Sequence, residues 1–318
     1  MKYKFFTFAS ILVLFFVCFA CKNEPSKPVT TAAAATGYIC PMNCEKGKVY
    51  DAPGNCPVCR MELEPVQAAV AANTAVYFTA FSAVPASLEA GKPGVMSFTP
   101  KVVGNESVPV PLDLVHEKKM HLILVSDDLS WFDHIHPEYQ ASGTYDIKLV
   151  AKGELTDAER GHSSTSFVTG GKYLAFTDYK PVGGLNQVNK TEINVAGAPA
   201  KVVQYTTAKM TTSVDGYSIT LDPHGATITA GKQGHLHIDI MENGKRLTPD
   251  KIENYLGAKA HVIMIETTSK DFLHVHPEVA GDELEMNTTF AQPGLYKTWL
   301  QFQTKGKVHT ADFLIKVQ

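Results

Sequence analysis

Cysteine is absent from most of this sequence: all six cysteines occur by residue 59, and none follows. A blue-copper electron-transfer centre needs one cysteine thiolate together with two histidines. The long segment after residue 59 therefore cannot hold such a centre, whatever β fold it adopts.

Motifs for phosphate binding and serine hydrolysis are also missing. No glycine-rich phosphate loop follows an apolar run, no Gly-x-Ser-x-Gly stretch occurs, and no pair of carboxylates stands out. We therefore predict that the protein is not an enzyme. The net charge of −3 gives no indication of a nucleic-acid partner.

Residues 1–20 have the composition of an export signal. Lys2 and Lys4 precede the apolar run "FFTFASILVLFFVCFA", which ends at Ala20. Cys21 follows, and the junction resembles the lipobox of bacterial lipoproteins. The resemblance implies lipidation of Cys21 and anchoring to a bacterial membrane, on its periplasmic face or at the cell surface; the alternative is plain secretion. Residues 21–36 are rich in Pro, Ala and Thr and predict a tether.

Four cysteines lie in residues 37–66 with the spacing of a metal knuckle. They occupy two tight turns, Cys-Pro-Met-Asn-Cys and Cys-Pro-Val-Cys: Cys40, Cys44, Cys56 and Cys59. A tetrahedral site needs four ligands that converge from two such turns. The alternative is two disulfides, which an exported protein can form, although a bridge within either turn would be strained.

This segment resembles the short heavy-metal-binding module of copper-transporting ATPases and copper efflux adaptors. The shared residues are Tyr-x-Cys-Pro-Met at 38–42, Pro-Gly at 53–54 and Cys-Pro-x-Cys-x-Met-x-Leu-x-Pro at 56–65. Asn43 and Cys44 replace the His-Pro of the module, which exchanges an imidazole for a thiolate. The resemblance implies a heavy-metal ion as ligand, copper(I) before zinc, and a metal efflux system as partner. Met42 and Met61 are further candidate ligands.

An internal repeat occupies the rest of the chain. "HLILVSDDLSWFDHIHPE" at 121–138 aligns without a gap with "HVIMIETTSKDFLHVHPE" at 261–278. Later segments align only after part of the first copy is left out, which indicates an inserted loop near 152–166. We predict two related domains joined by short linkers: a linker at 67–75, a first repeat at 76–197, a linker at 198–214 and a second repeat at 215–318.

Within each repeat, short runs rich in Val, Ile, Thr, Phe and Tyr are separated by Gly, Pro and Asp. About seven strands per repeat predict a mainly β protein: a small metal-knuckle module and two tandem antiparallel β-sandwich repeats, immunoglobulin-like or cupredoxin-like. Residues 255–277 also resemble a stretch found in poorly characterised exported bacterial proteins. That resemblance implies a sandwich domain in a metal-handling context.

Each repeat contains the motif His-x-His-Pro-Glu at a strand end, and residues i and i+2 of a strand share a face. A hairpin brings a third histidine near each motif, but its face depends on a register that the long loop leaves open. Two interpretations stay open: histidines bonded to backbone, or a three-histidine metal site in each repeat. The candidate ligands are His121, His134 and His136 in the first repeat, and His261, His274 and His276 in the second.

The remaining histidines give weaker signals. His235 and His237 form an i, i+2 pair only in the second repeat, and we expect surface histidines there. No role is assigned to the unpaired histidines His116, His162, His224 and His309.

These features predict an exported lipoprotein that binds a soft heavy metal for buffering, resistance or delivery to an efflux partner. Two other functions stay open. One is a binding or adhesion lipoprotein of immunoglobulin-like repeats with a structural zinc module. The other is a metalloenzyme in which His121, His134 and His136 leave one coordination position open.

Overall fold

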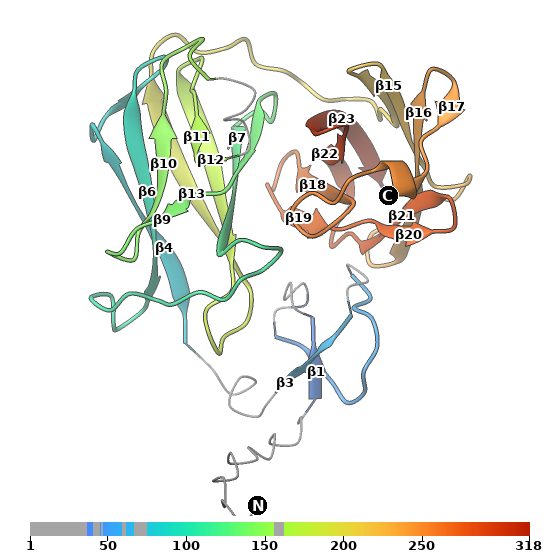
Figure 1. Cartoon of the computed structure of the whole chain (residues 1–318), viewed down its shortest axis with the longest axis horizontal. Coiled ribbons are helices and arrows are strands. Elements are labelled where there is room, and N and C mark those ends of the chain that lie inside the picture. The colour runs from blue at the N-terminus through green and yellow to red at the C-terminus, as the bar shows by residue number, and fades with distance from the viewer. Residues whose placement is uncertain (1–36, 41–44, 46, 59–61, 67–74, 156–161) are drawn as a thin grey trace, which may run out of the picture. The chain divides into compact units, whose positions relative to one another are not determined.

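A computed structural model describes residues 37–40, 45, 47–58, 62–66, 75–155 and 162–318 (Figure 1). The predicted export signal and tether lie outside these residues, as do five candidate site residues: Cys21, Met42, Cys44, Cys59 and Met61. Within the described ranges no helix is long and apolar enough to cross a membrane. The elements found there are strands, apart from the short 3-10 helix η1 (Pro249–Lys251), which confirms the mainly β prediction.

Residues 37–66 contain a three-stranded antiparallel sheet in the order β2-β1-β3. Its strands are β1 (Gly37–Ile39), β2 (Val49–Tyr50) and β3 (Glu64–Val66). Cys40, Cys56 and Leu63 are buried together as its small core. A core of this size stabilises little by apolar burial alone, so the segment depends on the chemistry of its cysteines.

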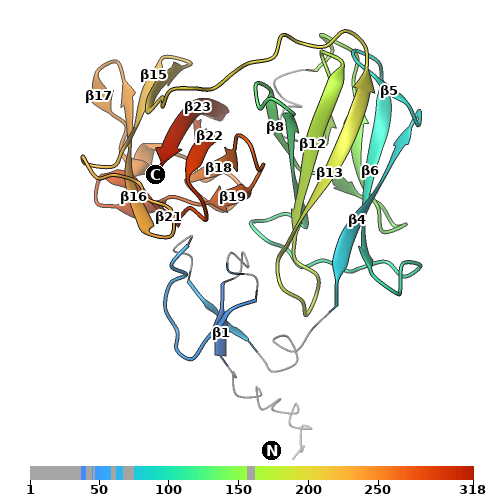
Figure 2. The same cartoon turned by 180° about the vertical axis from the view of Figure 1, so that it is seen from behind.

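The first repeat is a sandwich of two sheets, in the orders β11-β10-β6-β4 and β5-β13-β12-β7-β8, with β9 paired to β10. The pairs are antiparallel except for the short parallel pairs β10–β11 and β13–β5. Figure 2 shows β12 and β13 side by side. The bounds are β4 (Tyr77–Val84), β5 (Leu88–Glu89), β6 (Gly94–Val102), β7 (Met120–Ser126), β8 (Phe132–Ile135), β9 (Glu138–Tyr139), β10 (Tyr145–Leu149), β11 (Ser164–Thr165), β12 (Gly171–Tyr179) and β13 (Gln187–Ala196).

The second repeat has the same two-sheet plan, in the orders β14-β15-β16-β21-β20 and β19-β18-β22-β23, with β17 paired to β16. Residues 290–293 join β21 to β22, whereas residues 150–170 join β10 to β12, so the extra residues of the first repeat fall in the predicted loop. The bounds are β14 (Thr211–Val214), β15 (Tyr217–Asp222), β16 (Gln233–Glu242), β17 (Lys245–Arg246), β18 (Ala260–Glu266), β19 (Phe272–Val275), β20 (Glu278–Ala280), β21 (Glu283–Thr289), β22 (Gly294–Thr304) and β23 (Lys307–Val317).

Strands β7 and β18 are buried on both faces. One face packs inside its own sandwich, and the other contributes to an inter-repeat core made of residues from both repeats. Burial on both faces explains why "HLILV" and "HVIMI" are continuous apolar runs without polar alternation. The fully buried members of the inter-repeat core are Ile123, Val125, Leu129, Leu174, Phe176, Ile263, Ile265 and Trp299.

Two stacked aromatic pairs extend this core at equivalent places. Phe132 stacks on Trp299 with ring centroids 4.5 Å apart, and Phe176 stacks on Phe272 at 5.0 Å. Phe132 on β8 and Phe272 on β19 occupy aligned positions of the two repeats. Each repeat therefore packs the equivalent phenylalanine ring against the other repeat. The contact between the repeats is therefore approximately symmetric in its side chains.

Candidate metal centre

The β7–β8 hairpin of the first repeat decides which face His121 occupies. Its antiparallel register pairs Leu122 with Ile135 and Ile123 with His134. Because side chains alternate along a strand and paired residues share a face, His121, His134 and His136 point to the same side. That side carries the inter-repeat core, and the three histidines are 2%, 1% and 6% exposed.

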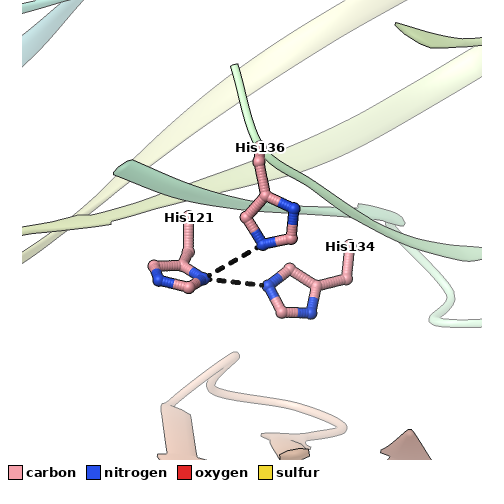
Figure 3. Close-up of side chains that lie close together, drawn as sticks. All are labelled: His121, His134 and His136. Atoms are coloured by element: carbon pink, nitrogen blue, oxygen red, sulfur yellow. Dashed lines mark hydrogen bonds between the residues drawn. The ribbon is translucent and has the colours of Figure 1, made fainter. Parts of the chain in front are cut away.

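The three imidazoles converge on one point, and we call them triad 1 (Figure 3). The Nδ1 atom of His121 lies 3.3 Å from Nε2 of His134 and 3.2 Å from Nε2 of His136. The structure thus assembles the three-histidine set in the first repeat, which the sequence left open.

The outer ring nitrogens of triad 1 bind groups that accept a hydrogen bond. His121 Nε2 donates to the carbonyl oxygen of Val115 at 3.0 Å, and His134 Nδ1 donates to Gln301 Oε1 at 2.8 Å. The Gln301 amide is oriented because its Nε2 donates to Thr310 Oγ1. A neutral imidazole has one N–H, so His121 Nδ1 and His134 Nε2 are both unprotonated. Their contact joins two lone pairs, which a shared cation would stabilise.

The second repeat builds an equivalent cluster, triad 2, from His261, His274 and His276. The β18–β19 register pairs Ile263 with His274, as in the first repeat. His261 Nδ1 lies 3.2 Å from His274 Nε2 and 3.0 Å from His276 Nε2. All three side chains are buried. Both three-histidine sets are therefore assembled by the same hairpin geometry.

The outer nitrogens of triad 2 are held in the same way. His261 Nε2 donates to the carbonyl oxygen of Tyr255 at 2.8 Å, and His274 Nδ1 donates to Asp178 Oδ2 at 3.2 Å. Asn186 Nδ2 donates to the other carboxylate oxygen of Asp178 at 2.7 Å. The carbonyl behind His261 and the carboxylate behind His274 fix the tautomer that turns a lone pair toward a metal, as in known metal sites. The buried Nδ1 of His276 has no hydrogen-bond partner among the described residues.

The two repeats exchange these supporting residues. Gln301 on β22 is paired with His261 but binds His134 of triad 1, and Asp178 on β12 is paired with His121 but binds His274 of triad 2. The triads also adjoin, since the ring centroids of His134 and His274 are 5.9 Å apart. Each triad therefore needs the other repeat to be complete.

Burial is the largest cause that lowers the imidazole pKa values in the triads, and neighbouring histidines lower them further. The pKa of His121 falls to about 4 and that of His274 to about 3. The pKa values of His134, His261 and His276 also lie well below the ordinary value. These rings are neutral at pH 7, which is the form that binds a metal. The contact from His274 to Asp178 is therefore a hydrogen bond from a neutral ring.

The spacing of the nitrogens fits a small metal ion. Tetrahedral coordination with metal–nitrogen bonds of about 2.0–2.1 Å separates the ligand nitrogens by about 3.4 Å. The nitrogens that contact one another in the triads are 3.0–3.3 Å apart. Imidazole sets of this kind suit zinc and copper.

His116 is a residue of this cluster that the sequence did not reveal. It lies in a tight turn with a left-handed backbone (φ 47°), and the equivalent turn of the second repeat has Leu256 at φ 52°. Its ring packs 4.0 Å from that of His276, and its buried Nε2 has no hydrogen-bond partner in the described part of the chain. Since His116 aligns with a leucine in the second repeat, no repeat signal marks it.

The cysteine module is described in part. Cys40 and Cys56, one from each predicted turn, are both buried in its core. The backbone N–H of Val58 donates to Cys56 Sγ at 3.4 Å. Cys44, Cys59, Met42 and Met61 lie outside the described residues, so the predicted four-thiolate set remains a prediction.

Two hollows lead toward the triads. A cleft of about 960 Å³ is lined by His134, Gln301 and Tyr255. A smaller cavity of about 190 Å³ is lined by Cys40 of the module and by Asn186, which binds Asp178 behind triad 2. The cleft therefore reaches triad 1, whereas the smaller cavity lies between the cysteine module and a residue that supports triad 2.

The other histidines lie apart from the triads. His235 and His237 are on the outward face of the second repeat, and the ring of His224 lies 3.9 Å from that of His237. His309 donates to Asp215, and the carbonyl oxygen of His162 accepts from the backbone N–H of His136.

Comparison with solved structures gives only remote similarity. Three domains of an outer capsid protein of bacteriophage RB49 match at 13% identity and a TM-score of 0.19, over 77% of this chain and 59% of that one. The Escherichia coli adhesin FdeC matches at 11% and 0.22, over 77% and 66%. A tandem repeat of a large adhesion protein matches at 8% and 0.23, over 76% and 49%. The chain thus spans about half to two thirds of these chains, and scores so low carry no argument about function.

Comparison with models of sequence families identifies two segments of the chain. No curated protein is detectably similar to the chain. Residues 212–318 match the model of a domain of unknown function (DUF8832), which coincides with the second repeat. Residues 38–66 match the model of the heavy metal binding domain, which confirms the predicted metal-binding module.

Proposed function

We propose that the protein is an exported lipoprotein that binds a soft heavy metal, copper before zinc, and holds it in two kinds of site. The heavy metal binding domain supplies thiolates, and triads 1 and 2 supply buried imidazoles. The observation that carries the proposal is the pair of buried contacts between unprotonated ring nitrogens, His121–His134 and His261–His274.

The two kinds of site suit different steps of metal handling. Thiolates bind Cu(I) strongly, and a module on a tether can capture an ion from its surroundings. The triads are buried and rigidly supported, which favours slow release and storage. A cavity lined by Cys40 and Asn186 adjoins the module, and Asn186 binds the Asp178 carboxylate that supports triad 2. Lipidation of Cys21 would keep the protein at a membrane surface, where an efflux system could accept the ion.

No covalent chemistry is assigned to the triads. A catalytic metal needs an open coordination position that a substrate can reach. Triad 1 borders a cleft through His134, but the histidines of both triads are at most 9% exposed. This burial favours binding over catalysis.

The test is a competitive titration of the full mature chain with Cu(I) and with Zn(II), beside two variants. Cys40→Ser/Cys56→Ser should lose the thiolate site and keep the triad sites, whereas His134→Ala/His274→Ala should do the reverse. Binding of Cu(I) at both kinds of site supports metal handling. Zinc that no competitor removes from the module, with no binding at the triads, would instead identify a structural zinc module in a binding or adhesion protein.

A further inference from the structure

The outward face of the second repeat carries a ladder of polar pairs between β16 and β21. Alternate residues of β16 are exposed, and the register joins Gln233 to Thr289, His235 to Asn287 and His237 to Glu285. The positions of the first repeat that align with the two histidines are Val95 and Ser97. The imidazoles of this face therefore belong to the second repeat alone.

Both imidazoles on this ladder have one ring nitrogen held by an oxygen. His235 Nδ1 donates to Asn287 Oδ1 at 2.7 Å, and His237 Nδ1 donates to Glu283 Oε2 at 2.8 Å. Glu283 is also bound by Arg246, so its position is fixed. The Nε2 atoms of the two rings face each other at 3.0 Å, so one metal ion can contact both.

A carboxylate completes this set. Glu285 Oε2 lies 3.6 Å from His235 Nε2, and the ligand atoms of these three residues lie within 4.8 Å of one another. The ring of His224 lies 3.9 Å from that of His237, tilted by 47°, and supplies a further imidazole beside the set. Asp222 pairs with His237 across the strands, and Asp239 and Glu283 are both ion-paired with Arg246. The carboxylate of Asp222 favours a cation beside His237.

We propose that His235, His237 and Glu285 form a surface site for a divalent metal ion of the Zn(II) or Cu(II) class. Two imidazoles and one carboxylate are a ligand set that such ions bind with an open position for water or another ligand. The set is partly exposed, so ions exchange with solvent more readily than at the buried triads. This site does not depend on the function proposed above.

The position of the surface site links it to the cysteine module. Pro57 and Val58 of the module dock on the end of the same ladder: Pro57 O accepts from Gln233 Nε2 and Thr289 Oγ1, and Val58 O accepts from Thr289 N. Successive residues of a strand are about 3.3 Å apart, so His235 follows the docking residue Gln233 by about 7 Å. The site therefore adjoins the turn that carries Cys56.

The test is calorimetric titration of the full chain with Zn(II), comparing the wild type with His235→Gln/His237→Gln. The double variant should bind one fewer Zn(II) ion. Glu285→Gln should keep that ion but weaken its binding by about tenfold. Glu192→Gln, which removes an exposed carboxylate on β13 of the first repeat, is the matched control for Glu285→Gln and should bind as the wild type does.

The substitutions lie on an exposed face, so the thermal unfolding temperature of the metal-free variants should match that of the wild type. An unchanged number of Zn(II) ions and unchanged affinities in the double variant would overturn the proposal. The cysteine and triad variants described above test the proposed function, and their outcome does not change the result for His235→Gln/His237→Gln. Failure of the surface site and failure of the proposed function are therefore distinguishable.

Discussion

Asp178→Asn should weaken metal binding at triad 2, although Asp178 belongs to the first repeat. The carboxylate accepts the Nδ1–H of His274 at 3.2 Å and is itself held by Asn186. An amide of the same size keeps the shape but lowers the basicity of the ring. Loss of such a supporting carboxylate typically costs 10–100-fold in metal affinity, or about 1.4–2.8 kcal/mol.

The assay is competition between the full chain and a chromophoric chelator for Zn(II). The background carries Cys40→Ser, Cys56→Ser and His237→Gln, which remove the module and surface sites, together with His136→Ala, which removes one ligand of triad 1. The titration then reports triad 2. The matched variant is Gln301→Glu, tested in a His276→Ala background, because Gln301 supports His134 at the equivalent place. A carboxylate at position 301 should increase the affinity of triad 1 for Zn(II). Equal affinities at triad 2 with and without the Asp178→Asn substitution would refute the exchange of supporting residues between the repeats.

Three further predictions concern stability. The pKa of His121 is about 4 in the folded chain and about 6.5 when unfolded, so the unfolded state binds more protons between these values. The metal-free protein should lose about 1.4 kcal/mol per pH unit through His121 as the pH falls from 6.5 toward 4, and the raised pKa of the buried Asp178 offsets part of this loss at the acid end. Equal denaturant midpoints at pH 7.5 and 5 would contradict this. Trp299→Ala should lower the free energy of unfolding by about 3–5 kcal/mol, because Trp299 is buried in the inter-repeat core and stacks on Phe132. A loss below about 1 kcal/mol in denaturant titration would be inconsistent with that packing. Removing metal with a chelator should lower the unfolding free energy by about 2.7 kcal/mol for each site at which the free metal concentration had been about 100 times the Kd. A melting temperature that does not change when the chelator is added would argue against buried sites.

The local features of the metal centre could be predicted from the sequence. The gapless alignment of the two repeats and the His-x-His spacing placed His134 with His136, and His274 with His276, on common faces. The face of His121 could not be predicted, because a slip by a single position in the β7–β8 register would reverse it. The structure supplies that register.

The supporting residues could not be predicted because they come from the other repeat. Asp178 and Gln301 have no motif around them, and they reach His274 and His134 across long sequence separations. One clue was present in the sequence: "HLILV" and "HVIMI" are apolar at every position after the histidine, which is typical of strands covered on both faces.

The surface histidines show a different limit of the sequence. His235 and His237 were correctly expected at the surface, but their partners Asn287 and Glu285 lie on a strand that comes much later in the chain. Pairing of β16 with β21 brings the four side chains together, and no local pattern announces that pairing.

The central claim is that each triad binds a metal ion through three imidazoles. It is tested most directly on the full chain with Cys40→Ser, Cys56→Ser and His237→Gln. These substitutions disable the cysteine module and the surface site and leave both triads intact. Metal analysis after loading with Zn(II) or Cu(I) should find two ions per chain. X-ray absorption should show only nitrogen or oxygen neighbours, at about 2.0 Å. A chain that retains no ion, or that retains the same ions after His134→Ala/His274→Ala, would contradict the account.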